Sequence, residues 1–270
     1  GSQPNGIALS PDGTALYAAS QGAGDKLSFY TVDPVTGLLT ANGSTATGDA
    51  PLSVSMCNDP KSGAPLANGG TFVANTGAAL ACAGGTAVVD GGTLLINGAN
   101  QTIATAMSLE AAGGTIDTNG NDTLIDGIVS GTGGLTKTGS GMLTLNAVNT
   151  YTGMTTVSAG TLAVGDATHP GASIAGSATV DSGARLIGHG AIGGSVFNQA
   201  AGTVAPGGSV GTLSVGGNYT QGGGATLEIE VSPAAGSQLA VNGTATLDGT
   251  LDLVYQAGSY SPSSYAIVTA

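Results

Sequence analysis

The sequence predicts an all-β protein in which residues 86–270 form a right-handed, single-stranded parallel β-helix. The chain has 49 glycines, no Trp and three Phe, and Lys and Arg together number only four. Such a composition suits strands and turns and disfavours helices. From residue 86 onward, short strands with aliphatic residues at alternate positions are each followed by a Gly or Asn corner. A β-sandwich would favour longer strands and more aromatic side chains in its core.

The first segment, residues 3–56, differs in character from the rest and predicts a small antiparallel sheet. Strands are expected at Ile7–Leu9, Ala15–Ala19, Leu27–Val32 and Leu38–Leu39, separated by turns rich in Pro, Asp and Gly. Four strands in about fifty residues is the size of one propeller blade. In its Pro4–Ala8, Ser10–Gly13, Leu16–Ala19 and Val32–Gly37 motifs, the segment resembles one blade of the lactonase-like, YVTN-type β-propellers.

The next segment, residues 57–85, is predicted to be a linker because it is rich in Pro, Asn, Ala and Gly, with one strand candidate at Thr71–Ala74. Cys57 and Cys82 bracket its polar loop. In an extracellular or periplasmic protein this spacing favours a disulfide that closes the loop. Two unpaired small core residues are the alternative. A metal site is disfavoured because His169 and His189 are distant in sequence and the chain has no CxxC motif.

A regular series of strands and corners follows. Strands are expected at Thr86–Val89, Thr93–Ile96, Thr102–Leu109, Gly114–Asp117, Thr123–Val129, Ala178–Val180, Arg185–Ile187, Ala191–Ile192 and Val196–Phe197. With about twenty residues per coil, as in known solenoid repeats, residues 86–270 would form about nine coils. Stacked at about 4.8 Å per coil, they would make a rod.

Gly133–Gly165 is the most regular unit of this series. We expect alternate apolar residues of its strands to point inward, while glycines and Asn149–Gly153 make the bends. The inward set is Leu135, Leu143, Leu145, Val157, Leu162 and Val164. Lys137, in the same unit, and Arg185 are interpreted as outward, solvated residues. The segment contains no cluster of reactive side chains.

The motifs of residues 110–270 extend this interpretation to a family. Gly113–Gly120, the Gly-Gly-Leu-Thr-Lys-Thr-Gly core, Asn149–Gly153 and Ala159–Leu162 resemble the passenger-associated repeat of AIDA-type autotransporters. Gly188–Gly194, Gly202–Gly207, Leu213–Thr220, Ala225–Val231 and several motifs up to Ala270 are similar to the C-terminal, autochaperone-like part of such passengers. The resemblance implies a β-helix stem at 86–188 and an autochaperone-like cap at 189–270. It also places a helical linker and a membrane barrel after Ala270, so we expect a fragment of a longer passenger.

The formal net charge of −12 disfavours nucleic acid as a partner, since a polyanion would be repelled. No apolar run is long enough for a transmembrane helix, and no signal-peptide pattern is visible at the start of the sequence, so we expect neither within these residues.

For each candidate chemical site, a structural interpretation is favoured over a chemical role. Asn119–Leu124 is similar to a calcium-binding nonapeptide, but a single copy of the motif supplies too few oxygen ligands for a calcium ion. Glu228 and Glu230 share the exposed face of a strand, and no nucleophile motif accompanies His169 or His189. We therefore expect no catalytic, cofactor or metal residues, and no enzyme.

The sequence leads us to expect a structural and adhesive surface module whose C-terminal coils template folding during secretion. The implied partners are the protein's own outer-membrane β-barrel translocator and host surfaces or sister passengers. The implied location is the cell surface or exterior of a Gram-negative bacterium, reached through the periplasm and outer membrane. Two alternatives stay open. One is the stalk of a propeller-bearing ligand-binding or lactonase-like protein, and the other is a calcium-dependent polysaccharide-active β-helix enzyme.

Overall fold

The computed structural model describes residues 85–261 and 264–270, together with the strand backbones at 4–9, 15–20, 26–32, 39–46, 66–67 and 71–74. No helix in this described part is long and apolar enough to cross a membrane. The first four strands form an antiparallel sheet in the order β1-β2-β3-β4, as the sequence predicts. Their bounds are Pro4–Leu9, Ala15–Ser20, Lys26–Val32 and Leu39–Ala46.

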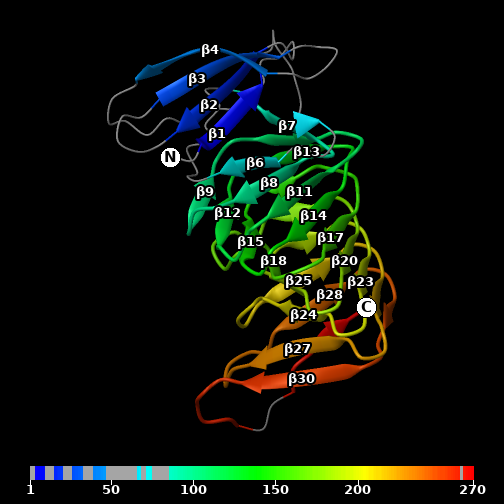
Figure 1. The fold of residues 1–270 in the computed structure, drawn as a ribbon. Helices are drawn as coiled ribbons and strands as arrows, with labels where there is room; N and C mark the ends of the chain where they lie inside the picture. Colours follow the sequence, from blue (N-terminus) through cyan, green and yellow to red (C-terminus); the bar gives the residue numbers. More distant parts are fainter. Residues whose placement is uncertain are drawn as a thin grey trace.

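All later strands are short and parallel and stack into a β-solenoid with three faces (Figure 1). The first face is a nine-stranded sheet, here called sheet C. Its strands are β6 (Thr71–Ala74), β8 (Thr93–Ile96), β11 (Gly114–Asp117), β14 (Leu135–Thr138), β17 (Thr155–Val157), β20 (Ala178–Val180), β23 (Val196–Asn198), β26 (Tyr219–Gln221) and β29 (Ala245–Thr246).

The second face, sheet D, has eight strands. They are β9 (Gln101–Ile103), β12 (Thr123–Ile125), β15 (Met142–Leu145), β18 (Thr161–Val164), β21 (Arg185–Gly188), β24 (Thr203–Pro206), β27 (Thr226–Val231) and β30 (Thr250–Tyr255). The third face is made by two successive sheets. Sheet B contains β5 (Leu66–Ala67), β7 (Ala87–Asp90), β10 (Met107–Leu109) and β13 (Val129–Gly131), and sheet E contains β16 (Val148–Asn149), β19 (Ser173–Ile174), β22 (Ala191–Ile192), β25 (Thr212–Val215), β28 (Gln238–Val241) and β31 (Val268–Thr269).

The predicted β-helix is thus confirmed, with two differences in its elements. The expected single strands Thr102–Leu109 and Thr123–Val129 are each two strands separated by a corner. The sequence is apolar on both sides of each corner, so its pattern alone predicts one continuous strand. In addition, β5 and β6 pair with β7 and β8, so the solenoid sheets extend into the segment that the sequence assigned to a linker.

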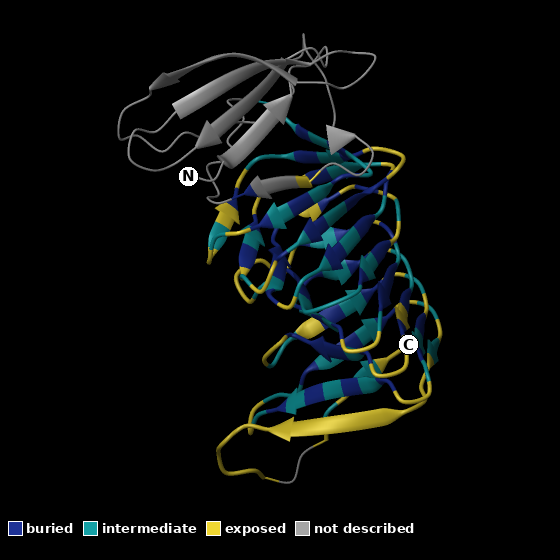
Figure 2. Cartoon of the chain, viewed as in Figure 1, coloured by how far each residue is buried: buried dark blue, intermediate teal, exposed yellow. Residues whose placement is uncertain are grey.

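Aliphatic ladders fill the interior of the solenoid. The residues predicted to point inward, Leu135, Leu143, Leu145, Val157, Leu162 and Val164, are all completely buried. Because each inward side chain lies against its register partner in the next coil, burial is distributed along the whole stack rather than concentrated at one centre (Figure 2).

Glycine is required at the corner that leads into sheet C, where backbone stacks directly on backbone. A Cβ atom on Gly153 would lie 2.3 Å from the carbonyl carbon of Gly133, and one on Gly176 would lie 2.2 Å from the carbonyl oxygen of Gly153. The corner therefore has no room for a side chain. This explains why at least one glycine recurs at this point of successive coils.

Candidate functional site

The first unusual group is Lys137, and its position corrects the prediction that it faces solvent. The side chain is completely buried, on the same side of β14 as Leu135. Its Nζ donates to the Thr118 hydroxyl at 3.0 Å, to the Thr138 and Gly139 carbonyls at 2.7 and 2.8 Å, and to the Ala159 carbonyl at 3.1 Å. Thr118 lies in the preceding coil and Ala159 lies in the following one. One ammonium group therefore ties three successive coils together.

Burial lowers the pKa of Lys137 from 10.5 to about 8, and the nearby carboxylates of Asp117 and Asp122 oppose that shift. Neither carboxylate forms a direct ion pair with it among the described residues. Backbone carbonyls supply most of its hydrogen bonds, which is how a buried cation is held when no counter-ion touches it. The buried side chain therefore holds successive coils together, and we call a buried polar group of this kind a structural lock.

A second lock, made by an amide, lies in the same repeat. Asn149 is buried; its Nδ2 donates to the carbonyls of Ala147 and Ser173 at 2.9 and 3.0 Å, and its Oδ1 accepts from the Val129 amide at 2.9 Å. Tyr151 is also buried, with its hydroxyl 2.7 Å from that of Thr155. Burial raises the pKa of Tyr151, which favours its neutral form. The Asn-Thr-Tyr-Thr-Gly motif thus supplies polar groups that are satisfied inside the corner.

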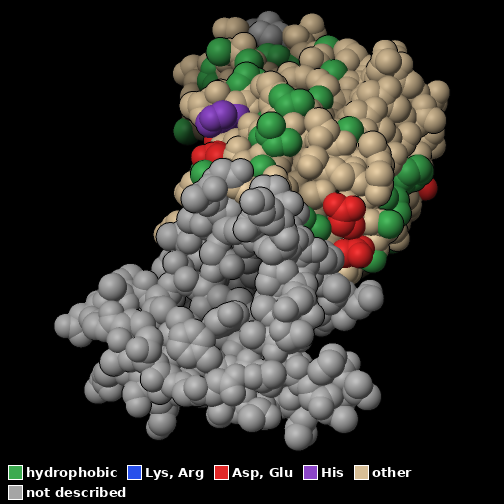
Figure 3. Space-filling model, turned by 90° about the horizontal axis from the view of Figure 1, so that it is seen from above, with side chains coloured by type: hydrophobic (Ala, Val, Ile, Leu, Met, Phe, Trp, Pro, Cys, Tyr) green, Lys and Arg blue, Asp and Glu red, His purple; other side chains and the backbone are tan. Residues whose placement is uncertain are grey.

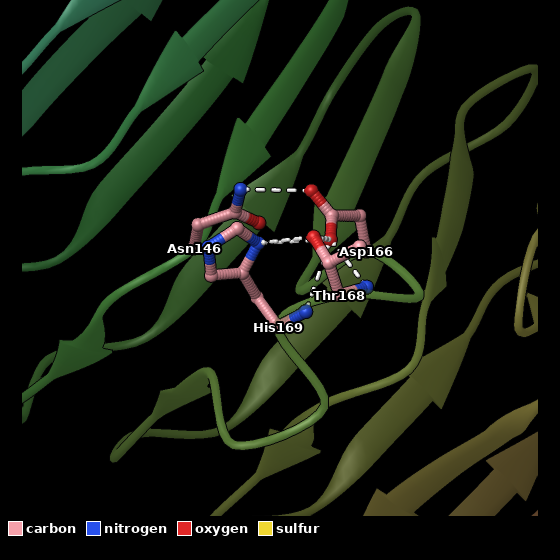
Figure 4. Close-up of polar contacts among 4 residues, drawn as sticks. All are labelled: Asn146, Asp166, Thr168 and His169. Atoms are coloured by element: carbon pink, nitrogen blue, oxygen red, sulfur yellow. Dashed lines mark hydrogen bonds and ion pairs between the residues drawn. The ribbon is translucent and has the colours of Figure 1, made fainter.

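The third group surrounds Asp166 and is shown in Figure 4. Asp166 Oδ1 accepts hydrogen bonds from the Thr168 hydroxyl at 2.6 Å, from the Thr168 amide at 2.8 Å and from the His169 amide at 3.0 Å. His169 Nδ1 lies 2.9 Å from the same oxygen, and Asn146 Nδ2 donates to Oδ2 at 2.9 Å. The hydrogen bond from the Thr168 hydroxyl, followed by those from His169 and Asn146, holds the pKa of Asp166 well below its usual range.

This cluster differs from a nucleophilic triad. Thr168 Oγ1 and Asp166 Oδ1 both approach the same nitrogen of His169, Nδ1. In a triad, the nucleophile and the carboxylate lie at opposite nitrogens of the imidazole. His189 lies one coil further on, where its amide donates to the Gly165 carbonyl at 3.2 Å. The role of Asp166 is therefore structural: its carboxylate accepts the hydrogen bonds that hold the turn after β18.

Arg185 faces outward, as predicted, but it is paired rather than free. Its guanidinium makes a bidentate ion pair with Glu228, with nitrogen–oxygen distances of 2.8 and 2.5 Å. The pair crosses the intervening strand β24 and so joins β21 to β27. The hydrogen bond from Arg185 lowers the pKa of Glu228. Leu227, Ile229 and Val231 point inward, which confirms the predicted orientation of this strand.

The calcium-like segment uses its carboxylates for turn geometry. Asn119 and Gly120 adopt left-handed φ values of 48° and 79°. Asp117 Oδ1 accepts from the Asn119 amide, and Asp122 Oδ1 accepts from the Met142 amide of the next coil, both at 2.8 Å. Within the described residues, no three His, Cys, Asp or Glu side chains lie together as metal ligands would. Cys57 and Cys82 lie outside those residues, so their disulfide stays a prediction.

The C-terminal end of the solenoid differs from its interior. Every residue of β30 is exposed, although β30 pairs residue by residue with the half-buried β27 (Figure 2). Leu251 and Leu253 continue the ladders of Leu227 and Ile229, yet they are 50% and 40% exposed. Beside them lie a hollow of about 600 Å³ lined by Tyr255, Tyr260 and Tyr265, among others, and a second, smaller one. The core ladders are therefore open at this end.

Together, the fold and these locks define a structural class: a parallel β-solenoid whose polar groups mostly join one coil to the next. Comparison with known proteins gives the particular kind. Residues 135–164 match the family described as Passenger-associated-transport-repeat, and they contain Lys137, Asn149 and Tyr151. The chain contains an autotransporter passenger repeat, as the sequence motifs suggested.

Two curated relatives point the same way. The chain is 43% identical over 88 residues to "Extracellular serine protease" of Serratia marcescens, a match that covers 32% of this chain and 8% of that protein. It is 35% identical over 103 residues to "Adhesin BmaC autotransporter" of Brucella suis biovar 1 (strain 1330), covering 38% of this chain and 3% of that protein. The chain thus spans less than a tenth of either relative. These matches support an autotransporter passenger domain.

Proposed function

We propose that this chain is a structural and adhesive module of an autotransporter passenger, and that its C-terminal coils template the folding of the coils upstream. The observation that carries the proposal is the continuous inter-coil pairing of sheets C, D and E. A coil in such a stack satisfies its backbone donors and acceptors on its neighbours, so each new coil needs a formed one to dock on.

The C-terminal coils are suited to form first. Strands β27 and β30 are six residues long and pair over six positions, whereas most other strands have two to four residues. Buried amides add to this part of the solenoid: Asn198 Nδ2 donates to the Thr226 carbonyl at 2.9 Å, and Gln221 Nε2 donates to the Thr250 carbonyl at 3.0 Å. Longer pairing and the hydrogen bonds that these buried amides donate would make these coils the most persistent nucleus.

On this proposal the module belongs to a protein carried by its own outer-membrane translocator to the surface or exterior of a Gram-negative bacterium. The passenger repeat and the relative named as an adhesin autotransporter support this location and role. Folding of the solenoid outside the membrane would then oppose backward movement of the chain.

The test is deletion of residues 190–270 from the full-length gene, with protease-resistant passenger at the cell surface as the measurement. Templating predicts loss of resistant passenger. A matched pair of single-coil deletions sharpens the result. Because Thr220 pairs with Thr246 and Thr115 pairs with Thr136, removal of 220–245 or of 115–135 takes out one coil in register. The first deletion should impair display more than the second, and equal, resistant display of both would refute templating.

A further inference from the structure

The outward face of sheet C carries a threonine at the same register position in eight of its nine strands. These residues are Thr71, Thr93, Thr115, Thr136, Thr156, Thr179, Thr220 and Thr246, and we call this surface the threonine face. Adjacent strands are about 4.8 Å apart, so threonines recur at that interval along the solenoid axis. Thr71 and Thr246 are exposed, Thr179 is buried, and the other five are half-buried. The strands of this face follow one another down the stack in Figure 1.

The ninth position is an exposed aromatic. Phe197 lies between Thr179 and Thr220 in the ladder and is 42% exposed. Met154 is 53% exposed, and its sulfur accepts from the Thr179 hydroxyl at 3.5 Å. An apolar platform thus interrupts the row of hydroxyls. Strand propensity explains a row of threonines on the outer side of a sheet, but it does not explain an exposed Phe and Met beside them in a chain with three Phe in all.

The charged side chains of this part of the chain limit the chemical class of ligand that the threonine face could bind. Between residues 85 and 270 the basic side chains other than histidine are Lys137 and Arg185, of which one is buried and the other is paired with Glu228. The carboxylates of the same region are Asp90, Glu110, Asp117, Asp122, Asp126, Asp166, Asp181, Glu228, Glu230, Asp248 and Asp252. In Figure 3, the coloured part of the surface shows carboxylates and a histidine, and no Lys or Arg side chain.

Two of these carboxylates lie beside the threonine face. Asp117 is two residues beyond Thr115, so it lies on the same side of β11, and Asp181 follows Thr179 in the same way. Asp181 is oriented by hydrogen bonds from Ser158 and Gln199. The face therefore combines regularly spaced hydroxyls, an aromatic platform and negative charge. An anionic polymer would be repelled, as would a second copy of this chain.

We propose that the threonine face binds an extended polysaccharide that carries free amino groups and lies along the solenoid axis. The sugar hydroxyls would hydrogen-bond with the threonines, the apolar face of one sugar would pack on Phe197, and protonated amines would pair with Asp117 and Asp181. Many weak contacts at a constant spacing would give useful affinity through multivalency. This inference rests on the proposed adhesive role and names its ligand class and surface.

The test measures binding of the purified chain to partially deacetylated chitin oligomers by calorimetry. Phe197→Ala should lower the affinity about tenfold, because an exposed aromatic that becomes covered contributes on that scale. The double variant Thr136→Val/Thr156→Val should lower it about fivefold or more. Thr203→Val, on sheet D, is the matched control and should leave the affinity unchanged. Circular dichroism checks that each variant is folded.

Absence of binding by the unmodified chain would overturn the proposal, and so would equal binding by all variants, which would indicate adsorption of a polycation to an acidic surface. Sedimentation of the same samples tests whether a second copy of the chain binds this face instead. If Phe197→Ala changes self-association and leaves binding of the chitin oligomers intact, the face is an interface between copies. These readouts use the folded chain in solution. They are thus separate from surface display, which tests templating.

Discussion

The ammonium nitrogen of Lys137 lies 3.0 Å from the hydroxyl oxygen of Thr118, one coil upstream, and both side chains are completely buried. The Thr118 hydroxyl in turn donates to the Thr138 and Gly141 carbonyls at 3.1 and 3.3 Å. A lysine that the sequence suggested to be a surface residue is therefore the centre of the polar corner of the passenger repeat.

Lys137→Met should destabilise the solenoid. The thioether fills the same space, but the carbonyls of Gly139 and Ala159 lose a donor, at a cost of about 1–3 kcal/mol for each group that stays buried. Urea unfolding followed by circular dichroism measures the change. Thr136→Val, one residue away on the outward side of β14, is the control and should change stability by less than about 0.5 kcal/mol. Equal unfolding midpoints for both variants would show that the ammonium does not stabilise the stack.

The pKa of Lys137 gives a pH dependence with a definite sign. Its value is about 8 in the folded chain against 10.5 ordinarily, so between these values the unfolded chain binds more protons. Stability should therefore rise with pH across this window, as the penalty of the buried charge is relieved. Tyr219, whose pKa burial raises to about 12, acts in the opposite sense above pH 10.

The measurement is the difference in unfolding free energy between the unmodified chain and Lys137→Met from pH 7 to pH 9.5, below the range in which tyrosines ionise. The unmodified chain should gain stability relative to the variant. A difference that stays constant with pH would mean that Lys137 keeps its proton throughout.

The Arg185–Glu228 pair should couple weakly and depend on salt. The two side chains are 33% and 26% exposed, so solvent screens the pair in part. A double-mutant cycle with Arg185→Ala and Glu228→Gln should give a coupling free energy of up to about 1 kcal/mol in dilute buffer. Because salt screens partly exposed charges, the coupling should fall in 1 M NaCl. A coupling that does not respond to salt would indicate that the bidentate hydrogen bonds, and not charge, hold β21 to β27.

Gly153→Ala should disturb the stacked corner, because the new methyl group would meet the backbone of Gly133. Overpacking against backbone that cannot move aside costs about 1–3 kcal/mol or more. Gly171→Ala is the control, since a Cβ atom there would have no neighbour within 4 Å and the φ of Gly171 is not positive. Thermal unfolding of the two variants checks this, and similar melting temperatures would contradict the close approach.

Cys57 and Cys82 should be joined by a disulfide when the protein is exported. Mass spectrometry of a non-reduced digest should find the linked peptide, and thiol titration of the unfolded chain should find no free thiol. Reduction should lower stability by about 3 kcal/mol if the bond constrains the unfolded loop. Two alkylated cysteines in protein recovered from the cell exterior would exclude the pairing.

Much of the fold could be predicted from periodicity, as the repeat shows. Leu143 and Leu145 lie on either side of Thr144, and Leu162 and Val164 lie on either side of the small Ala163, so a period of two places each pair on one side of its strand. The same rule, applied to Leu135, would have turned Lys137 inward. The expectation of a solvated lysine prevailed because burying a charge is costly, and the compensating acceptors come from other coils.

The β-solenoid, its inward ladders, its glycine corners and its passenger repeat could all be predicted, because strand period, turn residues and local motifs are encoded within a few neighbouring positions. The distant polar groups that meet could be identified only in the folded chain. The register between coils decides these contacts. It brings Thr118 and Ala159 to Lys137 and brings Arg185 to Glu228. It also aligns eight threonines in the same ladder as Phe197. Coils of unequal length set that register through contacts about twenty residues apart, which no local pattern specifies.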